Sequence, residues 1–116
     1  PTFQQADVQA TCRTLGIAVE ACSPLGRGAD LDAPAVVAAA ADLGVTPAQV
    51  VLRWAVQQGR IVIPKSLSAQ RQATNLDLFS FELSAEQVAQ IDALESGVAG
   101  RTGADPATAS FTQFRD

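Results

Sequence analysis

The sequence lacks histidine, tyrosine and methionine, and its 116 residues include only one tryptophan and two cysteines. Without histidine or tyrosine, the chain cannot complete catalysis that needs a histidine base, a tyrosine acid or a histidine-ligated metal. We therefore expect no metal site. The missing methionine means that residue 1 is a trimmed start or the edge of a fragment, and the sequence is consistent with both.

The sequence also lacks a large net charge and long apolar segments. Eight Lys and Arg against twelve Asp and Glu give a net charge of −4 with no block of like charge, so we expect neither nucleic acid nor an anionic membrane surface as a partner. No apolar run approaches the roughly 18 residues that cross a bilayer, and the first residues do not resemble a signal peptide. We expect a soluble, cytoplasmic chain with the composition of one globular domain.

The two cysteines are Cys12 and Cys22, which are ten positions apart and form no C-x-x-C pair. This spacing favours free thiols in a reducing compartment over a disulfide or a redox motif. We expect both thiols to be buried or half-buried.

The first part of the chain predicts a helix followed by a strand. Val8 and Leu15 belong to an apolar set at helical spacing, which predicts an amphipathic helix over residues 3–15. Residues 17–22 are apolar and partly β-branched, which predicts a buried strand. The loop at 23–28 (SPLGRG) is rich in turn-forming residues and has the composition of a functional loop.

The middle of the chain predicts two helices with clear ends. Asp32 begins one helix, and Gly44 ends it at the position where a left-handed cap is needed. The capping box TPAQ at 46–49 begins another helix, which we expect to run to about Gln58. Trp54 lies on this helix and is predicted to pack in the core.

The remaining sequence predicts a second strand and two capped helices. The run 61–63 (IVI) is a second buried strand, and Ser68 caps the helix that follows it. A second capping box, SAEQ at 84–87, begins a final helix whose apolar face extends to Leu94. Residues 97–116 are predicted to form an irregular C-terminal tail.

The order of these elements predicts an α/β fold. A strand, two helices, a strand and a helix form a crossover that is typical of parallel strands covered by helices. Two parallel strands expose two edges, and parallel sheets usually occur inside larger sheets or closed barrels. We therefore interpret the chain as part of a larger fold.

One segment has the composition of an anion site. Lys65 and Ser66 follow the second strand, Ser68 begins a helix, and Arg71 lies one turn into it. Two cations, hydroxyls and free helix amides around one point are typical of anion binding. An ordinary helix cap with two solvated cations is the alternative, and the spacing alone favours it. Lys65 is the only lysine in the chain and lies where α/β folds bind ligands, which strengthens the functional interpretation.

Four segments together resemble the aldo-keto reductase family, in particular the C-terminal part of bacterial members similar to diketogluconate reductases. They are LGIAVEACSPLGRG, VTPAQVVLRWAVQQG, IVIPKS with its following helix, and FELSAEQVAQIDAL. The resemblance covers nearly the whole chain. It implies that residues 1–116 form a partial domain, the C-terminal portion of a TIM (β/α)8 barrel with about two βα units, extra helices and the tail.

The resemblance also implies a cofactor site for NADP and the residues that form it. These cofactor-binding residues are Lys65, Ser66, Arg71, Asn75, Ser23, Leu25 and Gly26. By resemblance, the first three hold the adenosine 2′-phosphate, Asn75 contacts the adenine, and the last three line the pyrophosphate. Two positions depart from the family's pattern. Cys22 replaces an aromatic residue that stacks on the nicotinamide, and Thr74 replaces an acidic residue beside the asparagine.

The family's catalytic Asp, Tyr, Lys and His precede the part that this chain resembles, so we assign no catalytic residue to it. We expect it to be the cofactor-binding part of an NADP-dependent oxidoreductase that reduces a small aldehyde or ketone in the complete barrel, and to be inactive alone. The alternative is a non-enzymatic relic or interaction module that retains nucleotide binding. We also expect the isolated chain to self-associate through its open strand edges.

Overall fold

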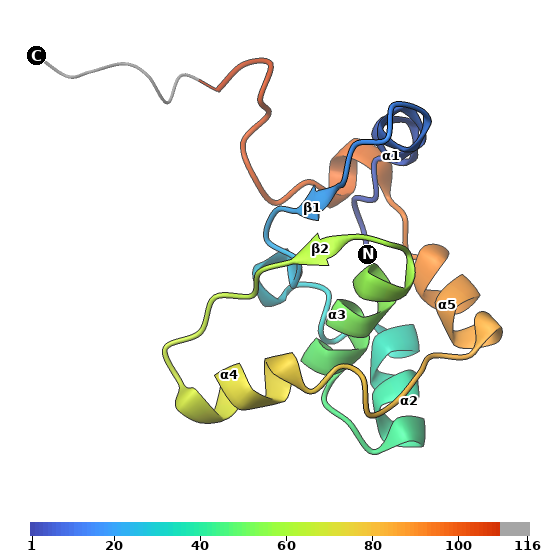
Figure 1. The fold of residues 1–116 in the computed structure, drawn as a ribbon, viewed down its shortest axis with the longest axis vertical. Coiled ribbons are helices and arrows are strands. Elements are labelled where there is room, and N and C mark those ends of the chain that lie inside the picture. Colours follow the sequence, from blue (N-terminus) through green and yellow to red (C-terminus); the bar gives the residue numbers. More distant parts are fainter. Residues whose placement is uncertain (110–116) are drawn as a thin grey trace, which may run out of the picture.

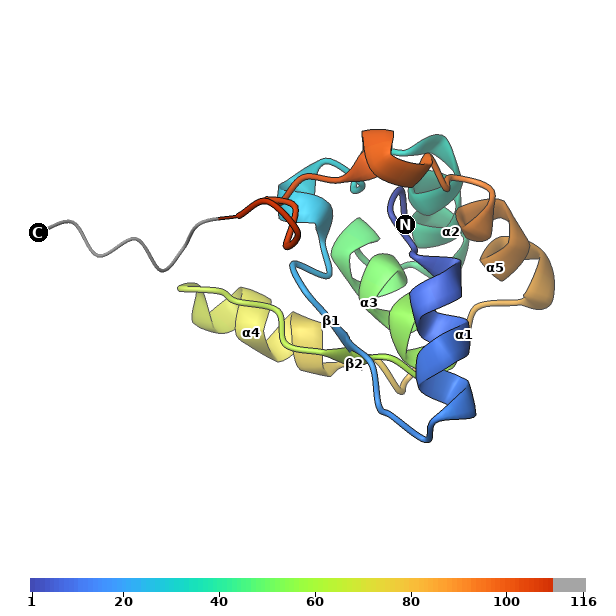
Figure 2. The ribbon, with the colours of Figure 1, turned by 90° about the horizontal axis from the view of Figure 1, so that it is seen from above.

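The computed structural model describes residues 1–109, in which helices surround a short two-stranded sheet (Figure 1). Figure 2 shows the same chain from above, with α1 and α4 at opposite ends of the strand pair. In chain order the elements are α1 (Ala6–Thr14), β1 (Glu20–Ala21), the 3-10 turn η1 (Gly26–Gly28), α2 (Pro34–Leu43), α3 (Pro47–Gln57), β2 (Ile61–Val62), α4 (Ala69–Leu76), α5 (Ala85–Asp92) and the 3-10 turn η2 (Gly97–Gly100).

The two strands are parallel, as the order of elements predicts. Glu20 lies opposite Ile61, and Ala21 lies opposite Val62. The Ile61 N–H donates a hydrogen bond of 2.9 Å to the Val19 carbonyl oxygen, which extends the ladder by one residue. The connection between the strands contains α2 and α3, so the predicted helical crossover is confirmed.

The core lies between α2, α3 and α5. Its buried residues are Val36, Ala39, Ala40, Val50, Val51, Trp54, Ala55, Leu83 and Ile91. The predicted core position of Trp54 is confirmed, since only 2% of this residue is exposed. Its indole Nε1–H donates to Asp92 Oδ1 at 2.7 Å, so the one polar group of the ring has a partner.

Several predicted helix ends are confirmed. Thr46 and Gln49 form the reciprocal hydrogen bonds of a capping box at α3, and Ser84 begins α5 in the same way. Gly44 ends α2 with φ of 67°, a left-handed conformation that costs glycine little. The start of α2 differs from the prediction, because Ala33 and not Asp32 precedes its first residue and no side chain caps it.

The first helix is shorter and more exposed than predicted. It begins at Ala6, after Gln5 has adopted a left-handed φ of 55°, and none of its residues is buried. Leu15, which the helical spacing placed on a buried face, is 65% exposed. The spacing correctly predicts a helix, but burial also requires an opposing apolar surface, and the described residues place none against this face.

The strands are also less buried than predicted. Ile17, Ile61 and Ile63 are all exposed, Ile63 by 66%. Val62 packs against the helical core. Because side chains alternate between the two faces of a strand, its neighbours Ile61 and Ile63 point to the face that no helix covers.

The tail after Ser96 is not wholly irregular, because η2 forms within it. Residues 110–116 of the predicted tail lie outside the described part of the chain.

In residues 1–109, no single helix is long and apolar enough to cross a membrane. Helices α2 and α3 pass that test only as a pair, and they meet at 97°.

Candidate functional site

A cavity of about 450 Å³ lies between the loop that follows β2, helix α4 and the start of α3. We call it the α4 cavity. Its lining residues are Leu25, Leu31, Thr46, Ala48, Lys65, Ser66, Leu67, Arg71, Thr74 and Asn75. Five of the seven predicted site residues are among them: Leu25, Lys65, Ser66, Arg71 and Asn75. Figure 1 shows the long loop from β2 that carries this segment to α4.

Two cations lie at the α4 cavity. Lys65 and Arg71 are both exposed, and neither forms an ion pair with an acidic side chain in residues 1–109. Their charges are therefore available to an anion in the cavity, and the N-terminus of α4 adds its positive dipole end.

Asn75 is the buried polar residue of the α4 cavity. It is only 9% exposed, and no group in residues 1–109 forms a hydrogen bond with its side-chain amide. The buried side-chain atoms without a partner belong to Arg60 and Arg101, so the amide of Asn75 is open to solvent through the α4 cavity. An amide left free at a cavity wall fits a ligand that supplies both a donor and an acceptor.

Three local hydrogen bonds fix the loop that carries the cations. Ser68 Oγ accepts from the Arg71 N–H at 3.3 Å, which confirms the predicted cap of α4. Ser66 Oγ accepts from the Ser68 N–H at 3.2 Å, and Gln72 Nε2 donates to the Ser66 carbonyl oxygen at 2.8 Å. These bonds fix the backbone of the loop and of the helix start, where Ser66 and Arg71 lie.

Thr74, which lies beside Asn75, also lines the α4 cavity. Its hydroxyl donates to the Gln70 carbonyl oxygen at 2.6 Å, one turn earlier in α4. The hydroxyl proton is therefore used within the helix and is not directed at a ligand.

Four residues that line the α4 cavity, on its apolar wall and on the side of α3, were not predicted from the sequence. These residues are Leu31, Thr46, Ala48 and Leu67. Leu31, Thr46 and Ala48 come from segments distant in sequence, and only tertiary packing brings them to α4. Leu67 is 91% exposed and is adjacent to the predicted segment, so a leucine between two serines of that segment is the signal that the sequence offers.

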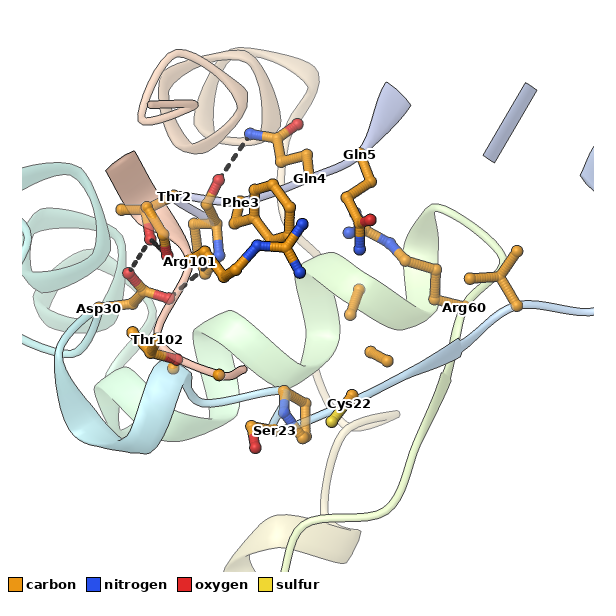
Figure 3. Close-up of a pocket in the computed structure, with 18 of the residues that line it drawn as sticks. Thr2, Phe3, Gln4, Gln5, Cys22, Ser23, Asp30, Arg60, Arg101 and Thr102 are labelled. Atoms are coloured by element: carbon orange, nitrogen blue, oxygen red, sulfur yellow. Dashed lines mark hydrogen bonds and ion pairs between the residues drawn. The ribbon is translucent and has the colours of Figure 1, made fainter. Parts of the chain in front are cut away.

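Ser23 and Gly26 do not line the α4 cavity but a second cavity of about 490 Å³ (Figure 3). This second cavity lies along β1, between the strand, the N-terminal segment and α3. Ser23 has a left-handed φ of 50°, and a Cβ at Gly26 would collide with the Asp30 carboxylate. Asp30 in turn accepts from Thr2 Oγ1 at 2.9 Å. The loop therefore needs a glycine at position 26, because any side chain there would clash with Asp30.

Three arginines line the second cavity, Arg27, Arg60 and Arg101, and two of them lie over aromatic rings. The Arg60 guanidinium lies 4.0 Å from the centroid of the Trp54 ring, and that of Arg101 lies 4.5 Å from the Phe3 ring centroid. Both Nε atoms are buried, and no group in residues 1–109 accepts a hydrogen bond from them. Burial lowers the pKa of Arg60 below its ordinary value, and the Asp92 carboxylate partly offsets this effect.

Both cysteines are free within the described residues, as predicted. Cys12 is half-buried, but Cys22 is exposed and lines the second cavity, so the prediction of burial is wrong for Cys22. Cys22 directly follows β1 and lies at the edge of the sheet, where few residues cover it.

The aldo/keto reductase family model matches residues 29–96. An aldo-keto reductase of Mycolicibacterium smegmatis is 46% identical over 112 residues, which are 97% of this chain and 40% of that protein. The 2,5-diketo-D-gluconic acid reductase B of a Corynebacterium strain is 46% identical over 98 residues, which are 84% of this chain and 35% of that protein. The chain thus spans about two fifths of the length of these relatives.

The solved structures that resemble this chain include aldo-keto reductases as well. A mutant of Gox0644 in complex with NADPH matches with a TM-score of 0.91 and 42% identity, over 96% of this chain and 41% of that one. A Bombyx mori aldo-keto reductase in complex with NADP matches with a TM-score of 0.75 and 40% identity, over 83% of this chain and 34% of that one. The predicted fold class, α/β and a portion of a (β/α)8 barrel, is confirmed by these superpositions.

Proposed function

This chain belongs to the aldo/keto reductase family, and on that premise we propose that it is the cofactor-binding portion of an NADP-dependent oxidoreductase. The complete barrel reduces an aldehyde or ketone, and NADPH supplies the hydride. The α4 cavity holds the adenosine end of the cofactor. Membership of the family and the NADPH and NADP complexes of similar structures support this proposal.

The observation that carries the proposal is the α4 cavity with its unpaired groups. The cations Lys65 and Arg71 lie at a cavity whose wall includes the side-chain amide of Asn75, which has no hydrogen-bond partner in residues 1–109. A 2′-phosphate carries close to two negative charges at neutral pH and meets both cations and the N-terminus of α4. Ser66 adds a hydroxyl, and the adenine supplies the donor and acceptor that the Asn75 amide needs.

The apolar wall of the α4 cavity suits the adenine ring. Leu25 and Leu31 are half-buried and pack against the core, and Leu67 is exposed at the opposite side. We propose that Leu25 reaches the cofactor from the loop after β1, with Ser23 and Gly26 farther along the pyrophosphate. The last two line the second cavity, so the pyrophosphate would connect the two cavities.

The chain's own residues bind and orient the cofactor but do not supply the proton. Reduction of a carbonyl requires a proton donor at the oxygen as hydride reaches the carbon. The sequence has no tyrosine or histidine for this role. We therefore propose that the donor belongs to the part of the barrel that this chain does not cover, and that Cys22 leaves the nicotinamide without an aromatic ring to stack on.

Comparing the affinities for NADPH and NADH tests the cofactor assignment. The chain is joined to the part of the M. smegmatis relative that it does not match, and both cofactors are titrated by calorimetry. A charge-assisted contact contributes about 1.5 to 3 kcal/mol, so Arg71→Ala should weaken NADPH roughly tenfold or more and leave NADH nearly unchanged. The matched control is Arg13→Ala, an exposed arginine on α1 outside both cavities. Equal losses for both cofactors, or no loss, would overturn the assignment.

A second candidate function is a non-enzymatic module that retains nucleotide binding. The open edge of the two-stranded sheet, which can pair with another chain, favours it. Carbonyl reduction by the joined chain would support the enzyme, whereas NADPH binding without reduction, in a joined chain that folds like the relative, would support the module.

A further inference from the structure

Within residues 1–109, the side chains that line the α4 cavity include no carboxylate. The polar ones are Thr46, Lys65, Ser66, Arg71, Thr74 and Asn75. The lysine and the arginine are cations that donate hydrogen bonds and accept none. Among the lining side chains, an acceptor for a ligand must therefore come from a hydroxyl or from the asparagine amide.

The three hydroxyls of the α4 cavity already have partners within the chain. Thr46 Oγ1 donates to Gln49 Oε1 at 3.0 Å and accepts from the Gln49 N–H at 3.2 Å. Thr74 Oγ1 donates at 2.6 Å to a backbone carbonyl oxygen one turn earlier in α4. Ser66 Oγ accepts from the Ser68 N–H at 3.2 Å and donates to the Ser68 carbonyl oxygen at 3.4 Å. The asparagine amide is therefore the neutral polar group that remains for a ligand.

The amide of Asn75 has no fixed orientation in the described part of the chain. It lines the cavity, and no group in residues 1–109 forms a hydrogen bond with it. A carboxamide has an oxygen that accepts and an NH2 group that donates, and half a turn about its last bond exchanges the two. Asn75 can therefore present either a donor or an acceptor at the same place.

Purine bases differ in the group that they carry at the 6-position. Adenine has a 6-amino group that donates, beside a ring nitrogen that accepts, whereas hypoxanthine has a 6-oxo group that accepts, beside a ring N–H that donates. A site with a fixed acceptor selects the amino base strongly, because the oxo base leaves that acceptor unpaired. An amide that can turn over forms two hydrogen bonds with either base.

We propose that Asn75 binds the base of the cofactor without distinguishing a 6-amino from a 6-oxo purine. The α4 cavity then binds the NADPH analogue in which hypoxanthine replaces adenine about as tightly as it binds NADPH. The apolar side chains of Leu25 and Leu31 suit both rings, because the two bases have the same shape. This inference rests on the proposed function, since it requires that the α4 cavity holds the adenosine end of the cofactor.

The test is calorimetric titration of the joined chain described above with NADPH and with its hypoxanthine analogue, in the absence of a carbonyl substrate. We expect the two dissociation constants to differ by less than about fivefold, which is about 1 kcal/mol. A preference of about fivefold or more for either ligand would overturn the proposal.

Asn75→Asp shows whether the amide is the group that tolerates both bases. An ionised carboxylate only accepts, so this variant should prefer NADPH over the analogue by about tenfold or more. The added charge also repels the 2′-phosphate, but both ligands carry that phosphate and the ratio of their affinities is unaffected. The matched control is Gln70→Glu, which adds the same charge on α4 outside both cavities and should leave the ratio unchanged. Equal affinities in Asn75→Asp would overturn the proposal.

A measurement on the unaltered joined chain covers the case in which the Asn75 variants do not fold. The side-chain amide signals of Asn75 are followed by NMR in the isotope-labelled protein. Adenosine 2′,5′-bisphosphate and inosine 2′,5′-bisphosphate should both shift these signals. Signals that move with the adenosine ligand alone, or with neither, would contradict the inference.

Titration with NADH separates this inference from the cofactor assignment. If NADPH and its analogue bind no more tightly than NADH, the phosphate assignment fails and this inference fails with it. If NADPH binds about tenfold or more tightly than both NADH and the analogue, the phosphate assignment stands and only this inference is overturned. Arg71→Ala should weaken NADPH and the analogue by the same factor, because both ligands carry the 2′-phosphate.

Discussion

At the scale of single residues, polar side chains at the edge of the core determine how the helices meet. Asp92 Oδ1 accepts from Trp54 Nε1 at 2.7 Å and from Gln58 Nε2 at 2.6 Å. These bonds join α5 to α3 and to the residue that follows it. The carboxylate is half-buried, so solvent replaces the protein donors only in part.

Trp54→Phe tests this arrangement. The smaller ring loses the N–H that reaches Asp92 together with part of the buried ring contacts, and hydrogen bonds to charged groups contribute about 1.5 to 3 kcal/mol. We expect the free energy of unfolding in urea to fall by at least that amount. A double-mutant cycle with Asp92→Ala, which removes the acceptor, provides the control, because the two changes should not be additive. Additive losses would show that the indole and the carboxylate act independently.

The sequence predicts some residues of the candidate site and not others, for a physical reason. Lys65, Ser66, Arg71 and Asn75 lie within one strand-to-helix connection, so their spacing already places them together. Leu31 is half-buried and reaches the same cavity only because α2 and α3 pack behind it. Patterns along the chain report local geometry and contain little information about such tertiary contacts.

At the scale of elements, helix ends are predictable because their hydrogen bonds join residues three apart. The capping boxes at Thr46 and Ser84 are examples. Burial is less predictable, since it depends on what lies opposite. The apolar residues Leu15 and Ile63 have the spacing of core residues and are exposed in the structure. Periodicity identified their elements correctly, but no described segment packs over them.

Thr46→Ala tests the contribution of the α3 cap. The Gln49 N–H loses the threonine oxygen that accepts from it at 3.2 Å. Loss of an N-cap costs about 1 kcal/mol and up to about 2 kcal/mol, so we expect a decrease of that size in the free energy of unfolding, measured in urea. Thr46→Ser retains an oxygen at the same place and should recover most of the loss. If serine were no better than alanine, the cap hydrogen bond would not be the source of the stability.

At the scale of the whole molecule, the chain has an open sheet edge and an uncovered apolar face. Ile17, Ile61 and Ile63 are exposed around the two strands. The isolated chain should self-associate through these surfaces. Sedimentation should show the average mass rising with protein concentration. A strictly monomeric chain at all concentrations would contradict the expectation.

The isolated chain should also fail to reduce carbonyl compounds with NADPH. The reason is chemical, since no tyrosine or histidine is present to donate the proton. The measurement is NADPH consumption with simple aldehydes, using a full-length reductase as the positive control. Turnover that persists after removal of contaminating reductases would refute this prediction.

The most direct test of the central claim compares two ligands that differ only in the 2′-phosphate, adenosine 2′,5′-bisphosphate and adenosine 5′-monophosphate. Each is titrated into the isotope-labelled chain by NMR. The α4 cavity predicts that the bisphosphate binds about tenfold or more tightly, and that it shifts the amide signals of Ser66, Arg71 and Asn75 most strongly. Equal affinity for the two ligands, or shifts centred on Arg60 and Arg101 in the second cavity, would contradict the claim that the α4 cavity recognises the 2′-phosphate.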